Sequence, residues 1–147
     1  MNLKDVEHRA DIEIIVEKFY EQVLADPIIG FIFVDIVKID LASHLPLIVN
    51  FWSDVLFHKP LPDKKDGSKT LYKGNVLNKH LQVNSLVALK PGHFTRWLYL
   101  FNQVIKQRFL GKNSELMMAR AELIAQSISA AITNQKKSAM NLVLPKD

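Results

Sequence analysis

The chain has 147 residues, of which 48% are hydrophobic and 23% are charged, and its formal net charge is +4. This balance is ordinary for a globular protein, so we expect a single domain spanning residues 1–147. The absence of cysteine excludes disulfides, thiolate-bound zinc, iron–sulfur clusters and covalently attached c-type haem. No apolar stretch reaches about 18 residues and the N-terminus lacks an apolar signal region, so we expect a cytoplasmic protein without a membrane span.

The first part of the chain predicts a helix followed by a short apolar segment. Residues 5–25 carry apolar side chains at every third or fourth position, which is the period of one helical face. Pro27 ends this helix because proline disfavours helical geometry in the residue before it. Residues 28–37 are apolar and β-branched, and alone they could form a buried strand. No partner strand with an alternating pattern appears, so we favour a short helix and a packed turn.

Residues 43–58 predict a second long helix. Ser43 can serve as its N-cap, and Pro46 then falls in the first turn, where a missing N–H costs little. Residues 59–73 contain prolines, a glycine and several lysines, so we expect an exposed loop.

The second half predicts three further helices and a tail. The short helix spans residues 75–82. The next helix begins at Pro91, a residue favoured at a first helical position, and ends near residue 109, before the terminator Gly111. The last helix spans residues 114–136, and residues 138–147 are expected to form a loose tail.

The excess positive charge gathers between residues 59 and 79. The charged residues there are Lys59, Lys64, Lys65, Lys69, Lys73 and Lys79, with Asp63 and Asp66. Such a segment can meet nucleic acid, anionic groups of a cofactor or an acidic protein, whereas a solvated loop explains it equally well. No aromatic residues alternate with these lysines, as binding of single-stranded nucleic acid would favour, so we do not expect a nucleic-acid partner.

Four side chains could act together on a flat iron cofactor. His80 offers a neutral imidazole, the usual axial ligand of haem iron, although a histidine on an apolar helix face is more often a core residue. Tyr20 and Trp97 could donate hydrogen bonds to an oxygen ligand, but each also fits an ordinary core. His44 either covers the same pocket or faces solvent. The cations available for the haem propionates are Lys73, Lys79 and Arg96.

The remaining histidines do not form a second group of this kind. We interpret His58 as a cation at a helix end and His93 as an exposed residue of a first helical turn. No His-x-x-x-His or Glu-x-x-His pair lies on one helix face, so a non-haem metal enzyme is the least favoured function. A cofactor-free basic helical module for binding or regulation is the stronger alternative.

Residues 10–132 resemble the truncated haemoglobins, and specifically their third group. The resemblance rests on Phe19-Tyr20, Asp26-Pro27 with Gly30 and Phe33, His44-Leu45-Pro46, Phe51-Trp52 with the four residues that follow, Tyr72-Lys73-Gly74-Asn75, His80-Leu81, and residues 93–101. It implies an all-α, globin-like fold abbreviated to two helices packed over two around haem b. The segment from His80 to Trp97 and the 59–70 loop are longer than usual for that group.

The resemblance also implies roles for individual positions. His80 matches the iron ligand, and Tyr20, Trp97 and His44 match residues that stabilise a bound ligand on the distal side. The matching pocket and packing positions are Phe33, Phe51, Trp52 and Tyr72, with Lys73 in contact with a propionate where arginine is more common, and Arg96 available at the rim.

The function that follows is binding of dioxygen, nitric oxide or carbon monoxide at ferrous iron. Oxidation of nitric oxide to nitrate and peroxide chemistry both stay open. Simple oxygen transport is the least favoured version, because strong donors in an apolar pocket slow oxygen release. Turnover as a dioxygenase would need an electron donor, and the lysine-rich segment is a candidate docking surface for an acidic reductase.

Overall fold

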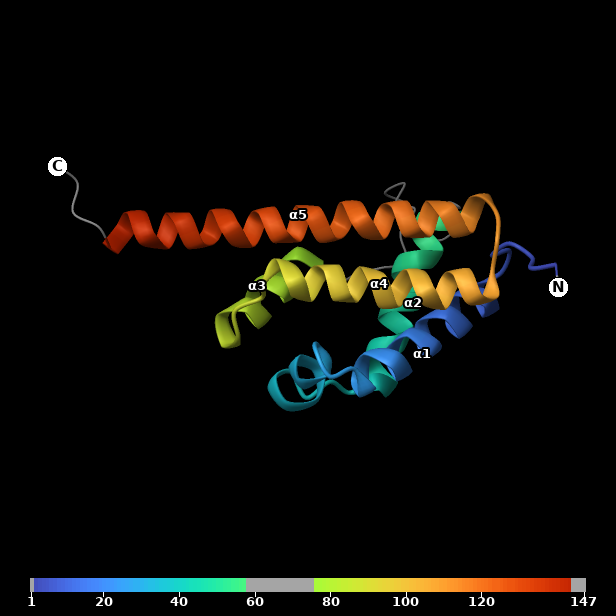
Figure 1. Cartoon of the computed structure of the whole chain (residues 1–147), viewed down its shortest axis with the longest axis horizontal. Helices are drawn as coiled ribbons and strands as arrows, with labels where there is room; N and C mark the ends of the chain where they lie inside the picture. Colours follow the sequence, from blue (N-terminus) through green and yellow to red (C-terminus); the bar gives the residue numbers. More distant parts are fainter. Residues whose placement is uncertain (1, 58–75, 144–147) are drawn as a thin grey trace, which may run out of the picture.

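The computed structural model describes residues 2–57 and 76–143, and over these ranges the chain is helical without strands. The elements are α1 (Arg9–Ala25), the π-helical segment η1 (Ile32–Ile36), α2 (Leu41–Phe57), α3 (Val76–Leu86), α4 (Pro91–Arg108) and α5 (Lys112–Val143). Figure 1 shows their order along the chain. The all-α fold class is confirmed.

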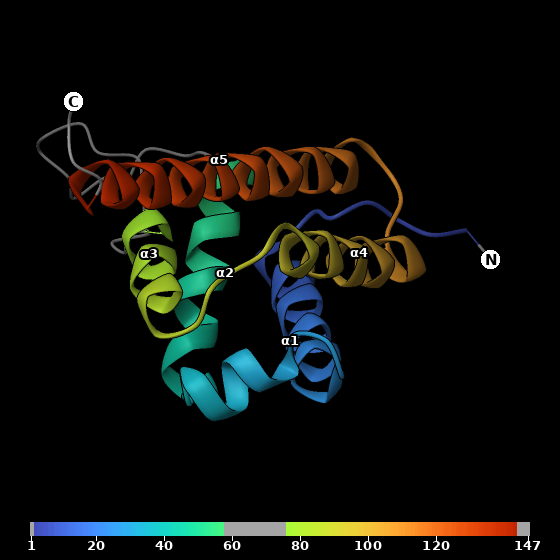
Figure 2. The same cartoon turned by 60° about the vertical axis from the view of Figure 1, so that its left-hand side comes forward.

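The long helices form two pairs. α1 packs on α2 and α4 packs on α5, while contacts of α1 with α4 and of α2 with α5 join the pairs. Figure 2 shows the axes of α1 and α2 running across those of α4 and α5. The short helix α3 packs against α5. This is the predicted arrangement of two helices over two.

The apolar stripe of α1 forms the centre of the core. Ile12, Ile15, Val16 and Val23 are at most 1% exposed, as the helical period predicts. Phe101 of α4 meets this stripe and is also 1% exposed. Burying a side chain of this size contributes roughly 1.5–3 kcal/mol, so the contact between α1 and α4 stabilises the join between the two pairs.

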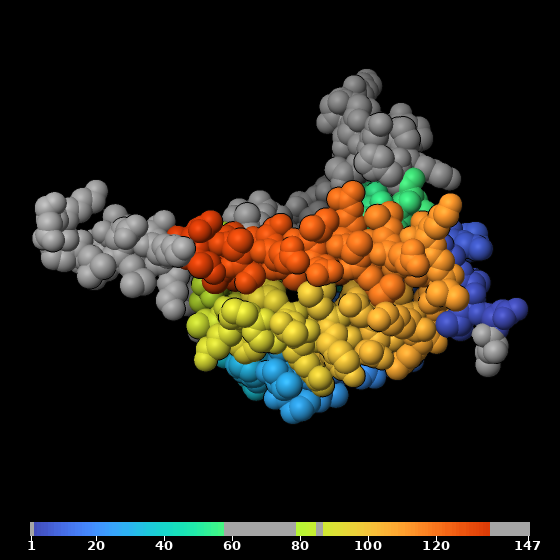
Figure 3. All heavy atoms as spheres, turned by 45° about the horizontal axis from the view of Figure 1, so that its top comes forward, coloured from blue at the N-terminus to red at the C-terminus, as the bar shows by residue number. Residues whose placement is uncertain are grey.

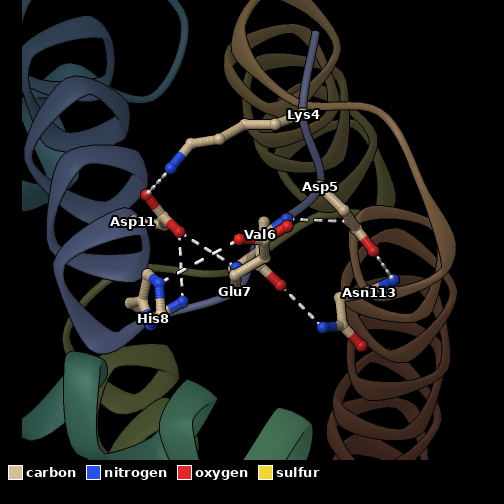
Figure 4. A network of polar contacts seen from close by, with 7 residues as sticks. All are labelled: Lys4, Asp5, Val6, Glu7, His8, Asp11 and Asn113. Atoms are coloured by element: carbon tan, nitrogen blue, oxygen red, sulfur yellow. Dashed lines mark hydrogen bonds and ion pairs between the residues drawn. The ribbon is translucent and has the colours of Figure 1, made fainter.

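The predicted start of the first helix at residue 5 is wrong, because the residues before α1 bind elsewhere. The Asp5 carboxylate accepts hydrogen bonds from the backbone N–H groups of Asn113 and Ser114, both at 2.9 Å, at the start of α5. Asp11 in turn accepts the backbone N–H of His8 at 3.0 Å and so caps α1. Figure 4 shows how this network ties the N-terminal segment to both helices.

The second long helix also begins earlier than predicted, at Leu41. Asp40, rather than Ser43, occupies the capping position, since its Oδ1 accepts the backbone N–H of Ala42 at 3.2 Å. The Ser43 hydroxyl instead donates back to Asp40. Pro46 therefore lies inside the helix beyond its first turn, where it removes one intrahelical hydrogen bond.

In the apolar segment 28–37, a turn is followed by helical residues 30–36, so the favoured interpretation over a buried strand is confirmed. Its π-helical turn includes a hydrogen bond from the Val37 N–H to the Ile32 carbonyl at 2.8 Å. Ile32 is buried while Phe31 and Val34 are exposed. The segment thus closes one end of the core and leaves part of its apolar surface uncovered.

Two helices extend beyond their predicted C-terminal ends. α3 continues to Leu86 instead of ending at residue 82, and α5 continues to Val143, so residues 138–143 of the expected tail are helical. The predicted start at Pro91 is confirmed. The expected loop at 59–73 lies outside the described residues. No helix in the described ranges is long and apolar enough to cross a membrane.

Candidate cofactor site

A cavity of about 530 Å³ lies between α1, η1, α2, α3, α4 and α5. Sites for cofactors and small molecules commonly have volumes of roughly 300–1,000 Å³ and mostly apolar walls with a few polar groups. The phenylalanine, tyrosine and tryptophan side chains that line this cavity are Phe19, Tyr20, Phe33, Phe51, Trp52, Phe94, Trp97 and Phe101. The cavity therefore has the size and the lining that a flat apolar ligand requires.

Tyr20 and His44 are hydrogen-bonded inside this cavity. Tyr20 lies near the end of α1 and is 6% exposed, and its Oη is 2.7 Å from Nε2 of His44 on α2. Burial raises the pKa of the Tyr20 phenol above its ordinary value, so the hydroxyl keeps its proton. The pair is joined by one short hydrogen bond whose direction depends on the imidazole tautomer.

His44 is held in its neutral form by its surroundings. Burial, together with the nearby positive charges of Lys79 and His80, lowers the pKa of His44 below its usual 6.5. Both neighbours come from α3 and also line the cavity. α3 therefore brings His80 to the cavity that also holds the Tyr20–His44 pair.

His93 also lines the cavity, which the sequence interpretation missed. The ring was expected to be exposed, but it is half-buried at the start of α4, and its Nδ1 accepts the backbone N–H of Lys90 at 3.1 Å. This bond leaves Nε2 as the nitrogen that could meet a ligand. His93 lies four residues before Trp97, so helical spacing placed both on one face and could have revealed it.

An aromatic stack fixes the indole of Trp97. Its ring lies parallel to Phe101, with centroids 5.4 Å apart and an interplanar angle of 3°. Phe101 stacks in turn on Trp52 at 5.2 Å, and Phe19 meets Trp97 edge-on at 5.6 Å. Such pairs contribute about 0.5–1.5 kcal/mol each beyond burial, so the indole has a defined orientation at the cavity wall.

Arg96 is not brought together with the other candidates. Its Nε and Nη2 bind Oδ1 of Asp26 at 2.8 and 2.6 Å, and the Asp26 side chain is 2% exposed. Asp26 also accepts the backbone N–H groups of Ile28 and Ile29 at 3.0 Å. Arg96 thus joins α4 to the turn after α1, and its expected place at a haem rim stays a prediction.

Some of the remaining predicted cofactor-binding residues line the cavity, and others lie outside the described residues. Phe33, Phe51 and Trp52 line the cavity. Tyr72 and Lys73 lie outside the described residues. In the described part, no three histidine or carboxylate side chains gather in a group that could hold a metal ion.

The helices superpose on a known globin. The crystal structure of a group III truncated haemoglobin from Campylobacter jejuni matches this structure with a TM-score of 0.72, covering 89% of this chain and 95% of that chain. The chain has the fold of a truncated haemoglobin. The sequence identity to the C. jejuni protein is 24%. No family model and no curated protein matches the sequence. The likeness to a truncated haemoglobin therefore establishes the fold, and function has to be argued from the cavity.

Proposed function

We propose that this protein binds haem b in the cavity and holds a diatomic ligand such as dioxygen, nitric oxide or carbon monoxide at ferrous iron. The observation that carries the proposal is the convergence of Tyr20, His44, His80 and Trp97, which come from four different helices, on one aromatic cavity. Each residue alone fits an ordinary helical core. An ordinary core does not explain why all four line one space large enough for a cofactor.

The residues present fit haem b. The aromatic walls suit a flat apolar macrocycle, and a bound haem would supply an iron site for a diatomic ligand. His80 would bind the haem iron, since it is half-buried and lines the cavity. Lys79 is exposed but also lines the cavity, so its ammonium group can pair with a propionate as a point charge.

The polar side chains would act on the bound diatomic ligand. The Tyr20 hydroxyl keeps its proton, and the Trp97 indole N–H can donate but not accept. Donors in a dry pocket stabilise partial negative charge on a ligand more strongly than they would in water. This favours retention or conversion of the ligand over fast release, so oxidation of nitric oxide to nitrate fits the site better than oxygen transport.

The absorption spectrum of the purified protein tests the proposal. After addition of hemin we expect a haem band near 400 nm (roughly, a property of the cofactor) that shifts when the protein is reduced under carbon monoxide. A folded protein that stays colourless with added hemin would reject the proposal and favour a cofactor-free binding module.

Paired histidine variants identify the iron ligand. His80→Ala should lose stable haem retention, because the iron loses its protein bond, whereas His93→Ala should keep it. Haem transfer to an acceptor protein measures retention in both variants. The opposite pattern would assign the iron to His93, which lines the same cavity.

A further inference from the structure

His93 is a polar residue of the cavity that the proposed function leaves without a role. It lies in the first turn of α4, lines the cavity and is half-buried. Tyr20 and His44 are hydrogen-bonded to each other, and the proposed function assigns His80 to the iron. His93 therefore adds a further imidazole to the cavity wall, and the hydrogen bonds of its ring decide what it can bind.

The Nδ1 atom of His93 is occupied by the backbone. It accepts the N–H of Lys90, the N-cap residue of α4, at 3.1 Å. A neutral imidazole carries one N–H and one bare nitrogen, so a bare Nδ1 places the proton on Nε2. The nitrogen left for a ligand is then a hydrogen-bond donor. A ring in this form does not offer Nε2 to iron, and it favours a negatively charged oxygen instead.

The ring of His93 is also held from the side. Phe31 meets it edge-on, with ring centroids 6.2 Å apart and an interplanar angle of 70°. Figure 3 shows the yellow atoms of α4 meeting the light-blue atoms of the segment after α1 at the surface of the molecule. Phe31 is 40% exposed, so the contact lies at the edge of the cavity rather than at its centre. A donor at this edge would meet the periphery of a flat cofactor.

The periphery of haem b carries negative charge. Two propionate groups extend from one side of the macrocycle, and a carboxylate beside a protein wall needs a cation or a donor to replace water. Lys79 lines the cavity and can pair with one propionate. Its flexible ammonium supplies charge without direction, whereas a ring N–H in a fixed orientation supplies a directed hydrogen bond. In the described part of the chain, His93 offers such a donor for the other propionate.

We propose that His93 binds a haem propionate by donating its Nε2–H to the carboxylate, and so anchors the cofactor at the start of α4. The inference rests on the proposed function, because it concerns the haem that would occupy the same cavity. It gives His93 the role of a cofactor anchor and leaves the iron to His80.

An isosteric pair of substitutions tests the anchor. His93→Gln and His93→Glu both keep an oxygen that can accept the Lys90 N–H, as a capping box requires. The two side chains differ in one group, which is a donor in glutamine and a negatively charged oxygen in glutamate. Glutamine should therefore replace the imidazole, whereas glutamate should repel a propionate. The iron bond to His80 keeps haem in both variants, so the rate of haem transfer to an acceptor protein compares them.

Esterification of the cofactor removes the charge that the anchor would bind. Hemin should leave His93→Glu about tenfold faster than the wild-type protein or His93→Gln, equivalent to about 1.4 kcal/mol. Hemin dimethyl ester, whose propionates are neutral, should leave all three proteins at similar rates. Equal rates of hemin transfer from His93→Glu and His93→Gln would overturn the anchor. A difference that persists with the ester would also overturn it, because the difference would then come from the fold of α4.

The tautomer of His93 tests the inference in the protein without haem. Nitrogen NMR of the imidazole rings should show the proton on Nε2 and a bare Nδ1. A proton on Nδ1 would overturn the anchor, because Nε2 would then present a lone pair to a carboxylate. Absence of hemin binding to the wild-type protein would reject the proposed function together with the anchor. Hemin binding with equal transfer rates from the two variants would reject the anchor alone.

Discussion

Tyr20 and His44 are polar side chains in a largely apolar cavity, and their mutual hydrogen bond decides what each can offer a ligand. Tyr20 Oη and His44 Nε2 are 2.7 Å apart, so both groups are satisfied before a ligand arrives. A ligand must bridge this pair or compete with it. The two residues therefore act as one coupled donor unit in a setting where unpaired polar groups are costly.

Removal of the Tyr20 hydroxyl should weaken ligand retention. In Tyr20→Phe we expect dioxygen to dissociate about tenfold faster, because the lost hydrogen bond is worth roughly 1–3 kcal/mol. Stopped-flow displacement of dioxygen by carbon monoxide measures the rate. Tyr99→Phe is the control, since Tyr99 is 53% exposed. An unchanged rate in Tyr20→Phe would remove Tyr20 from the ligand site.

Local patterns predicted most of the cavity residues but not their partners. Tyr20, His44, His80 and Trp97 lie on apolar helix faces, and this is visible in the sequence. The sequence shows that Arg96 is a cation but not which acidic residue it pairs with, so it was available as a cation for a haem rim. Its ion pair with Asp26 spans 70 residues of sequence, and only the packing of α4 on the end of α1 brings the two together.

At the scale of elements, the turn between α4 and α5 depends on a glycine. Gly111 has φ of +152°, and a Cβ atom there would overlap the side chain of Asp5. The Asp5 carboxylate occupies this space because it caps the start of α5 through Asn113 and Ser114. A side chain at position 111 would therefore strain the backbone and displace the cap at the same time.

Gly111→Ala should destabilise the fold by at least about 1–3 kcal/mol, from backbone strain and loss of the cap. Gly92→Ala is a matched control, because a Cβ atom at position 92 of α4 would meet nothing within 4 Å. There we expect no loss, and a gain of up to about 1 kcal/mol from reduced freedom of the unfolded chain. Urea unfolding followed by circular dichroism measures both, and equal stabilities would contradict the role of Gly111.

The ion pair between Asp26 and Arg96 makes stability depend on pH. Burial raises the pKa of Asp26, but hydrogen bonds from Arg96 and from the backbone of Ile28 and Ile29 outweigh it, so the pKa lies below 3.8. The carboxylate therefore stabilises the fold above pH 3.8, and this contribution is lost as the pH falls through the lower folded-state pKa.

Asp26→Asn should lower the free energy of unfolding at pH 7 by about 1–3 kcal/mol, a value reduced because the Arg96 side chain is 31% exposed. The difference from wild type should shrink as the pH drops below 3.8, since the carboxylate becomes protonated first in the unfolded chain and, at lower pH, in the folded protein. Unfolding curves between pH 7 and pH 3 check this. Asp35→Asn, at an exposed position, is the control. A difference that stays constant with pH would show that Asp26 does not act through its charge.

Periodicity predicted the elements well and their ends poorly. The stripe of α1 and the proline at the start of α4 are local signals, and both were confirmed. The predicted start of α1 was wrong because the Asp5 carboxylate accepts hydrogen bonds from the start of α5. These partners lie more than 100 residues away in the sequence. α5 continues past residue 136 because no proline or glycine interrupts residues 133–143.

At the scale of the whole molecule, the two crossed helix pairs enclose a cavity of about 530 Å³. An apolar space of this size lacks the dispersion contacts that a filled core would provide. A ligand that fills the cavity should therefore raise the free energy of unfolding, in addition to supplying a reactive group. This links the proposed cofactor to folding.

Haem should raise the thermal midpoint of the protein. At a free concentration 100 times the dissociation constant, a ligand specific for the folded state adds about 2.7 kcal/mol. Calorimetry with and without haem measures the gain. Metal-free protoporphyrin IX is the matched control, because it fills the cavity without an iron bond to His80. Equal gains with both would show that the imidazole adds nothing, and no gain with haem would contradict binding to the folded state.

The arrangement of helix pairs was predicted through the resemblance of particular segments, and the C. jejuni structure confirms it at the level of the fold. The residues themselves predicted helices but not how these cross.

The chain contains two tryptophans, Trp52 and Trp97, and both line the cavity and stack on Phe101. All the indole fluorescence of the protein therefore originates at the cavity wall. A porphyrin in the cavity would absorb this emission at close range, so the brightness of the protein should report cavity occupancy directly. The molecule carries its own optical probe, and titrations of cofactor uptake need no attached dye.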